Sequence, residues 1–285
     1  MLFDSHAHLN FKAFADDLSE VIKRCQQQKM LVINVGSQLP TSKRAVDIAE
    51  QNKGFFAAVG IHPIHTGGVS LDPTEAGEDK EIEKMSTEQM FAEVSGLAQN
   101  ARVVAIGETG LDYYHLDSGR EKVKELQTKV FLQHIALANA LNKPLILHAR
   151  PFKDDDVYHD LIDILKSQKD LLPFSDKKGV IHCFVGDLEI AKQFIDLGFA
   201  VGFTGIITFK TKSKDLQRVV KELPLENILI ETDSPYLSPE PFRGKRNEPM
   251  FVEQVAKKIA EIKGIKVEEV IEATAKNAKE IFKII

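Results

Sequence analysis

The chain has 285 residues, of which 43% are apolar, and a formal net charge of −5. This composition supports a large core and excludes a disordered or fibrous protein. The negative charge argues against a protein that coats duplex DNA, because such binding depends on neutralising many phosphates. It does not exclude an enzyme that grips one or two phosphates. Cys25 and Cys183 lie in segments expected to be a helix and a strand, and are expected to be reduced core thiols.

The sequence shows no sign of membrane association. No apolar stretch is long enough to span a bilayer. The first expected strand begins at the initiator Met, which leaves no room for a signal peptide. We therefore expect a cytoplasmic enzyme with no membrane partner, and nothing in the sequence indicates an obligate protein partner.

Eight short apolar runs are predicted to be strands. They lie at about residues 2–6, 30–36, 55–61, 102–107, 144–148, 179–183, 199–203 and 227–232. Most are continuous runs of Val, Ile, Leu, Phe and Ala, which is typical of strands buried on both faces. Segments with helical spacing separate most of them. Strand alternating with helix eight times predicts an α/β fold, a TIM (β/α)₈ barrel, as a single domain over 1–285. A doubly wound open sheet is the alternative, but no Gly-rich phosphate loop follows the first strand.

Two helices are expected to end the chain, at about 250–263 and 267–283. Gly264 is the expected break between them, and Pro249 suits the first turn of the former. The stretch at about 66–84 differs in composition, because it carries glycines, a proline and several acids, including Glu75. It predicts an exposed acidic loop insertion after the third strand. Such a loop either shapes substrate access or is a tolerated surface insertion.

Six residues of metal-ligand type stand at the ends of predicted strands, where a barrel would gather them at one face. They are His6, His8, Glu108, His148, His182 and Asp233. Each alone has an ordinary explanation, such as a buried core histidine or a charge that begins a helix. Together, four imidazoles and two carboxylates suit two borderline ions such as Zn²⁺ or Mn²⁺, about 3.5–4 Å apart. Mg²⁺ prefers oxygen ligands and fits four histidines less well.

The spacing of these residues suggests roles for several of them. His6 and His8 are two apart on a strand, so their side chains point to one face. Asp4 shares that face and is expected to orient an imidazole. Glu108 can bridge two cations. Asp233 can both ligate an ion and accept the proton of an attacking water.

Several motifs then carry a resemblance that covers positions 4 to about 250. They are Asp-Ser-His-Ala-His-Leu (4–9), Gly-Ile-His-Pro (60–63), Gly-Glu-Thr-Gly-Leu-Asp-Tyr-Tyr (107–114), His-Ala-Arg (148–150), His-Cys-Phe (182–184), Glu-Thr-Asp-Ser-Pro-Tyr-Leu (231–237), and Arg-Gly (243–244) with Asn-Glu-Pro (247–249). The chain resembles the TatD-type metal-dependent deoxyribonucleases of the amidohydrolase superfamily. The resemblance implies a TIM barrel with one or two divalent ions (Zn, Mn or Mg). It also implies hydrolysis of DNA phosphodiesters, often as a 3′–5′ exonuclease on DNA ends or single strands.

By this resemblance the six residues are the metal ligands, and Asp233 and Glu108 are catalytic. The segment between the Gly-Ile-His-Pro motif and Glu108 is longer than is usual in the family, because of the acidic stretch. His62, Arg150 and Arg243 are the expected substrate contacts, since an arginine can fork onto a phosphate. A structural role for His62, set by Pro63, is the alternative.

Other cations and aromatic residues near these motifs have a weaker case. Lys212 and Lys214 are expected to be a solvated helix start rather than phosphate contacts. Tyr113 and Tyr114 are expected to pack against the next loop, although they could stack on a base.

Two other functions remain open from the sequence. One is a metal-dependent hydrolase of a small ester, lactone or amide, since one barrel scaffold carries many chemistries. The other is a non-catalytic metal-binding or scaffold protein, against which a carboxylate in the position of Asp233 argues.

Overall fold

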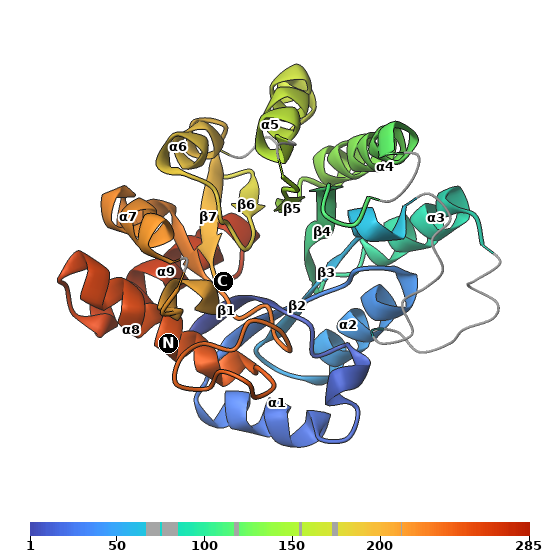
Figure 1. The fold of residues 1–285 in the computed structure, drawn as a ribbon. Coiled ribbons are helices and arrows are strands. Elements are labelled where there is room, and N and C mark those ends of the chain that lie inside the picture. Colours follow the sequence, from blue (N-terminus) through green and yellow to red (C-terminus); the bar gives the residue numbers. More distant parts are fainter. Residues whose placement is uncertain (67–74, 76–84, 117–119, 154–155, 173–175, 212) are drawn as a thin grey trace.

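The computed structural model describes residues 1–66, 75, 85–116, 120–153, 156–172, 176–211 and 213–285. Eight parallel strands lie side by side in chain order, and helices surround them (Figure 1). The strands are β1 (Phe3–Ala7), β2 (Leu31–Val35), β3 (Phe55–Val59), β4 (Val103–Asp112), β5 (Leu145–Arg150), β6 (Gly179–Ile181), β7 (Phe199–Phe203) and β8 (Ile228–Ile230). The predicted TIM barrel is confirmed.

Hydrogen bonds just beyond β8 join the last strand to the first. The backbone N–H of His8 donates to the carbonyl of Ser234 at 2.8 Å, and the N–H of Asp233 donates to the carbonyl of His6 at 2.9 Å. Ala7 and Ser234 form a parallel bridge at the same point. These bonds close the sheet into a barrel. They also bring the motif at 4–9 beside the motif at 231–237.

The helices form the outer layer of the barrel. They are α1 (Leu18–Gln27), α2 (Leu39–Gln51), α3 (Thr87–Leu97), α4 (Arg120–Leu141), α5 (Val157–Ser167), α6 (Leu188–Asp196), α7 (Lys214–Glu222), α8 (Val252–Lys263) and α9 (Val267–Phe282). Gly264 ends α8 with a φ of 67°, so the predicted break is confirmed. Pro249 begins a short 3₁₀ helix, Pro249–Phe251, that leads into α8.

Alternate strand residues serve two apolar cores, because successive side chains in a strand point to opposite faces. One core lies between the strands and the outer helices. The other includes strand residues such as Ile33, Ile146 and Leu229 together with the last turns of α9. Phe282 of α9 packs against Phe3 of β1, with ring centroids 6.4 Å apart. The C-terminal helix therefore contributes directly to this second core.

Strand lengths differ from the predicted ones where the ligand-type residues lie. β4 continues to Asp112 rather than ending at 107, and its register shifts between Ile106 and Thr109. Glu108 therefore lies inside a strand, at an irregularity that turns its side chain toward the site. β6 and β8 end early, so His182 and Asp233 stand in the loops that follow them.

The predicted acidic loop at 66–84 lies outside the described residues except for Thr66 and Glu75. The prediction of an exposed loop is wrong for Glu75, whose side chain is 9% exposed. Its carboxylate accepts hydrogen bonds from Ser37 Oγ at 2.5 Å and lies 3.3 Å from His65 Nε2. These partners compensate the cost of burying a charge.

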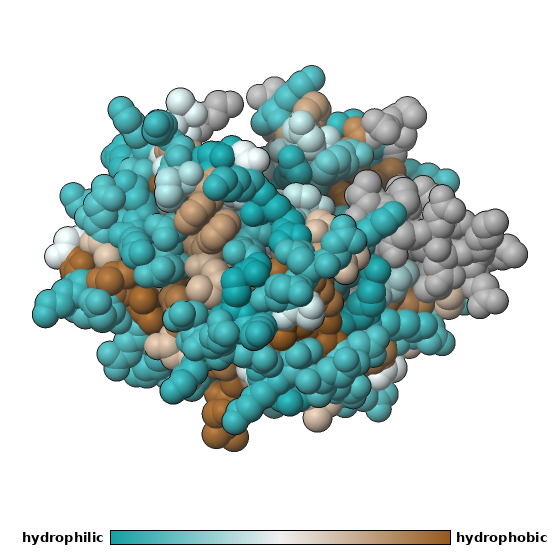
Figure 2. Space-filling model, turned by 90° about the horizontal axis from the view of Figure 1, so that it is seen from below, coloured by the Kyte–Doolittle hydropathy of each residue, from teal (hydrophilic) through white to brown (hydrophobic). Residues whose placement is uncertain are grey.

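Polar side chains cover most of the face shown in Figure 2, and apolar residues there are scattered among them. This distribution is expected where the apolar residues fill the two cores. Among the described residues, no helix is both long enough and apolar enough to cross a bilayer.

Candidate metal centre

The closing of the barrel assembles one half of the site. His6 lies on β1, His8 follows it, and Asp233 is held beside both by the bonds between the first and last strands. The two imidazole Nε2 atoms are 3.1 Å apart. Asp233 Oδ1 lies 3.3 Å from His8 Nε2 and 3.9 Å from His6 Nε2. Two ring nitrogens and a carboxylate oxygen thus converge on one point.

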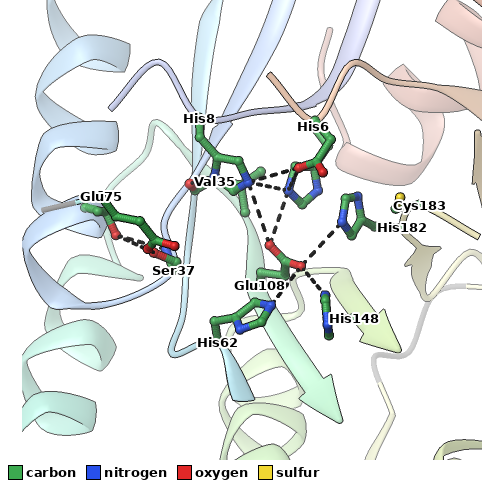
Figure 3. A network of polar contacts seen from close by, with 12 residues as sticks. His6, His8, Val35, Ser37, His62, Glu75, Glu108, His148, His182 and Cys183 are labelled. Carbon is green, nitrogen blue, oxygen red and sulfur yellow. Dashed lines mark hydrogen bonds and ion pairs between the residues drawn. The ribbon is translucent and has the colours of Figure 1, made fainter. Parts of the chain in front are cut away.

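Glu108 stands between this group and a second group of imidazoles (Figure 3). Its Oε2 atom lies 3.3 Å from His6 Nε2 and 3.9 Å from His8 Nε2. Its Oε1 atom lies 2.7 Å from His148 Nδ1 and 3.4 Å from His182 Nε2. His62 Nε2 also lies 3.4 Å from Oε1. The two carboxylate oxygens therefore face different groups of histidines, and such a carboxylate could hold two cations.

Two buried acids orient the second pair of histidines, and neither was given a role from the sequence. Glu231 Oε1 lies 3.0 Å from His182 Nδ1, and Asp112 Oδ2 lies 3.2 Å from His148 Nε2. A hydrogen bond to the far ring nitrogen fixes the tautomer and aims the near nitrogen. Both acids sit inside motifs already singled out, so a search for carboxylates next to ligands would have found them.

Asp4 does not orient an imidazole, so this prediction is wrong. Its carboxylate accepts hydrogen bonds from Thr232 N at 2.9 Å, Thr232 Oγ1 at 2.6 Å and His6 N at 3.3 Å. Asp4 therefore joins β1 to the end of β8. The acceptor for an imidazole of the first pair is the carbonyl of Val35, 2.7 Å from His8 Nδ1.

The electrostatics of the cluster follow from burial and from the close approach of opposite charges. Burial alone would raise the pKa of Glu108, but the imidazoles of His182, His62 and His6 hold that pKa well below its ordinary value. Burial alone would lower the pKa of His182, but Glu231 and Glu108 raise that pKa to about 10. Asp233 likewise has a pKa below its ordinary value, because contact with His8 outweighs burial. The carboxylates are therefore ionised, and they favour positive charge between them.

The residues present fit divalent ions. The donor atoms of His6, His8 and Glu108 lie within 4.8 Å of one another, and so do those of His182, Cys183 and Asp233. Four imidazoles with two carboxylates match the preference of Zn²⁺ or Mn²⁺ more closely than that of Mg²⁺. The six residues predicted as ligands are thus brought together by the structure.

The cluster opens into a cleft of about 550 Å³ at the carboxyl ends of the strands. His62, predicted to contact substrate, lines this cleft, and so does Arg150. The Arg150 guanidinium lies 4.2 Å from the ring centroid of Tyr114, which is half exposed. Arg243 is not among the described residues that line the cleft. Its guanidinium lies 3.8 Å from the Phe209 ring centroid and donates to the carbonyl of Ser238.

The structure also bears on the predictions for the tyrosines, lysines and cysteines near the motifs. Tyr113 is buried, but its hydroxyl donates to Asp160 of α5 at 2.8 Å, so it contacts a helix rather than the expected loop. Tyr114 contacts a loop as expected, because its ring centroid lies 5.7 Å from that of Phe152 after β5. Lys214 begins α7, as expected of a helix start, and Lys212 lies outside the described residues. Cys25 is a buried free thiol in α1, as expected. Cys183 is also a free thiol, but it lies in the turn after β6 and is only partly buried, so the prediction of a core thiol in a strand is wrong for it.

A closed parallel barrel with histidines and carboxylates gathered at the carboxyl ends of its strands defines a metal-dependent hydrolase. The family model described as TatD related DNase matches residues 3–283. The chain belongs to this family.

Known relatives agree with this assignment. The chain is 41% identical to the uncharacterized metal-dependent hydrolase YabD of Bacillus subtilis, over all of both chains. It is 33% identical to the uncharacterized metal-dependent hydrolase YcfH of Escherichia coli, with 99% of this chain and 96% of the relative covered. Among solved structures, the TatD homolog YjjV of E. coli has a TM-score of 0.82 at 26% identity, covering 100% of this chain and 98% of that one.

Proposed function

We propose that this chain hydrolyses DNA phosphodiester bonds, acting from 3′ ends as a metal-dependent exonuclease. The observation that carries the proposal is Glu108, whose two oxygens face different groups of imidazoles beside Asp233 in the lining of the cleft. Glu108 and the surrounding histidines would hold two ions, which would suit in-line displacement at phosphorus. The description of the matching family as TatD related DNase supports DNA as the substrate.

Each residue of the site has a proposed role in this reaction. His6, His8, Glu108, His148, His182 and Asp233 would hold one or two divalent ions. When bound, such ions lower the pKa of the attacking water and stabilise negative charge on the phosphoryl group. Asp233, whose side chain is 15% exposed to the cleft, accepts the proton of the attacking water. Arg150 on the rim of the cleft contacts a phosphate through its guanidinium.

A time course on end-labelled oligonucleotides tests the proposal. Single- and double-stranded oligonucleotides, labelled at either the 5′ or the 3′ end, are incubated with Mg²⁺, Mn²⁺ or Zn²⁺ or with a chelator. We expect a descending ladder from 5′-labelled strands and early release of the 3′ label, both abolished by the chelator. Release of the 5′ label first would reverse the proposed direction. Intact DNA together with rapid hydrolysis of a lactone or small ester would replace this function with the alternative.

A further inference from the structure

The cleft above the metal centre has two walls of different character. Beyond Cys183 and the ligand-type residues, the lining after β6, β7 and β8 is an apolar wall of Val185, Ile206, Tyr236 and Leu237. The lining after β2 to β5 is a polar wall, whose polar residues include Ser37, Glu75, His115 and Arg150. A substrate with a planar apolar part and a charged part would therefore bind in one orientation.

Two residues of the apolar wall are open to solvent. Few large apolar side chains are exposed in the described part of the chain, and away from its two ends they are Tyr114, Leu132, Leu171, Val185 and Tyr236. Val185 and Tyr236, which are 45% and 46% exposed, both line the cleft. Exposed apolar residues that gather beside a polar site indicate a surface that a ligand covers.

Hydrogen bonds fix the backbone of Tyr236 while its ring stays open. Its N–H donates to the carbonyl of Asp233 at 2.9 Å, and its carbonyl accepts a hydrogen bond from Asn247 Nδ2 at 2.6 Å. Asn247 is fully buried and also donates to the carbonyl of Thr232 at 2.9 Å. A residue whose backbone is already fixed loses little freedom when a ligand binds to it.

Tyr236 lies close enough to the metal centre to contact a nucleotide bound there. The ring of Phe11 stacks on His8 with centroids 4.2 Å apart, and the Tyr236 ring lies edge-on to Phe11 at 6.4 Å. A single ring therefore separates Tyr236 from a ligand-type imidazole. In cleavage from a 3′ end, the attacked phosphate is the 5′ phosphate of the terminal nucleotide, so the base of that nucleotide lies one sugar away from the metal centre.

We propose that Tyr236 is the stacking platform for the base of the 3′-terminal nucleotide, an inference that rests on the proposed function. Every base has an aromatic face, so stacking on a tyrosine holds the terminal nucleotide whatever its sequence. Val185 and Leu237 complete the apolar surface around the base. The charged backbone of the strand then extends toward Arg150 in the polar wall. Tyr236 is thus a specificity-determining residue that selects substrates with a planar base beside the scissile phosphate.

Three variants test the stacking contact. Tyr236→Ala removes the ring, and Tyr236→Phe keeps it. Leu171→Ala is the control, because Leu171 is also 46% exposed but lies in the 3₁₀ helix Lys169–Leu171 and is not part of the cleft lining. On a single strand that ends in thymidine, we expect kcat/KM for release of the first nucleotide to fall about 5- to 150-fold in Tyr236→Ala. Tyr236→Phe should recover most of this loss, and Leu171→Ala should match the parent.

A strand that ends in 5,6-dihydrothymidine shows whether the tyrosine ring acts on the base. The saturated base keeps the polar groups of thymine but has no aromatic face. We expect the parent to prefer the strand that ends in thymidine, and Tyr236→Ala to cleave both strands equally well. An equal loss with both strands, or a changed affinity for Mn²⁺, would give Tyr236 a structural role and overturn the inference. Parent-like kcat/KM in Tyr236→Ala would overturn it as well.

Binding of 2-aminopurine deoxyribonucleoside 5′-monophosphate with Mg²⁺ present provides a readout without turnover, because stacking on a ring quenches the fluorescence of this base. We expect quenching by the parent, Tyr236→Phe and Leu171→Ala, but not by Tyr236→Ala. Quenching by a parent protein that cleaves a small ester but no DNA would support the base site while the proposed function fails. Cleavage of DNA without quenching would overturn the base site and leave the proposed function intact.

Discussion

At the scale of single residues, the acids of the site have two different roles, one for Asp233 and another for the two acids that contact the histidines. Asp233 approaches two ring nitrogens and also faces the cleft. Glu231 and Asp112 lie on the far side of His182 and His148 and are almost fully buried. The first acid can exchange a proton with a reactant, whereas the other two can act only through the imidazoles that they orient.

Replacing Asp233 by Asn tests the proposed base. The amide keeps the shape of the side chain but cannot accept a proton, so we expect most turnover to be lost, about 10²–10⁴-fold. Circular dichroism should show an unchanged fold, and the control variant Asp163→Asn, on the exposed face of α5, should remain fully active. Hydrolysis at the normal rate by Asp233→Asn would remove Asp233 from this role.

Replacing Glu231 by Gln tests the orienting contact on His182. The variant loses a charged acceptor for His182 Nδ1 and for the backbone N–H of Cys183. We expect the affinity for Mn²⁺ to fall about 10–100-fold, as is usual when the outer partner of a ligand is removed. A chelator competition assay measures the change. Equal affinity in the variant and the parent would show that the His182 ring is held by its packing alone.

At the scale of strands, a register shift and two glycines position these side chains. β4 combines a register shift with Gly110, whose φ is +140° and whose Cβ position would lie 2.1 Å from the carbonyl oxygen of His148. A side chain there would force β4 away from β5 and so would separate Glu108 from His148. On the other side of the barrel, Gly202 of β7 leaves the space that the Glu231 carboxylate fills.

Gly202→Ala tests this use of space in β7. An added Cβ would lie 2.7–2.9 Å from the carboxylate of Glu231, so the acid must move away from His182. We expect weaker Mn²⁺ binding than in the parent protein. In the double variant Gly202→Ala/Glu231→Gln, the Gly202→Ala change should weaken Mn²⁺ binding little beyond Glu231→Gln alone, because both substitutions act through the contact between Glu231 and His182. Gly96→Ala in α3, where nothing lies within 4 Å, is the matched control and should bind Mn²⁺ normally. Full additivity of the two substitutions would contradict this link.

At the scale of the whole molecule, the site is formed by residues that are far apart in the chain, from position 6 to position 233. The ligand-type residues come from β1 and the residue after it, from β4 and β5, and from the loops after β6 and β8. Ions bound among them would therefore join segments that the barrel already closes through the bonds between β1 and the end of β8. Binding to the folded state alone stabilises that state.

Removal of metal should lower the stability of the whole chain. At an ion concentration of 100 times Kd, we expect the free energy of unfolding to rise by about 2.7 kcal/mol over chelator-treated protein. Thermal unfolding with and without Mn²⁺ measures this. Glu108→Gln should show a smaller rise, because the side chain that would hold the ions loses its charge. An unfolding temperature insensitive to Mn²⁺ would contradict the assignment of a metal centre.

The apparent affinity for the ion should increase with pH. Glu231 and Glu108 raise the pKa of His182 to about 10, so ion binding must displace protons.

The sequence by itself determined the barrel and the residues that gather at one of its faces. Buried parallel strands leave a strong signal, because both of their faces are apolar, and the ends of parallel strands necessarily meet at one edge. His6, His8, Glu108, His148, His182 and Asp233 could therefore be grouped before any distance was known. The family resemblance followed from the same motifs.

The tertiary structure decided which atoms face one another, since these contacts join residues far apart in the chain. Asp4 was expected to hold an imidazole but instead bonds to Thr232, and Glu75 was expected on the surface but is buried against Ser37 and His65. The directions of the two oxygens of Glu108 and the position of the acid behind His182 depend likewise on the closed barrel. A linear pattern records which residues are near a strand end, but not the angle at which each side chain leaves it.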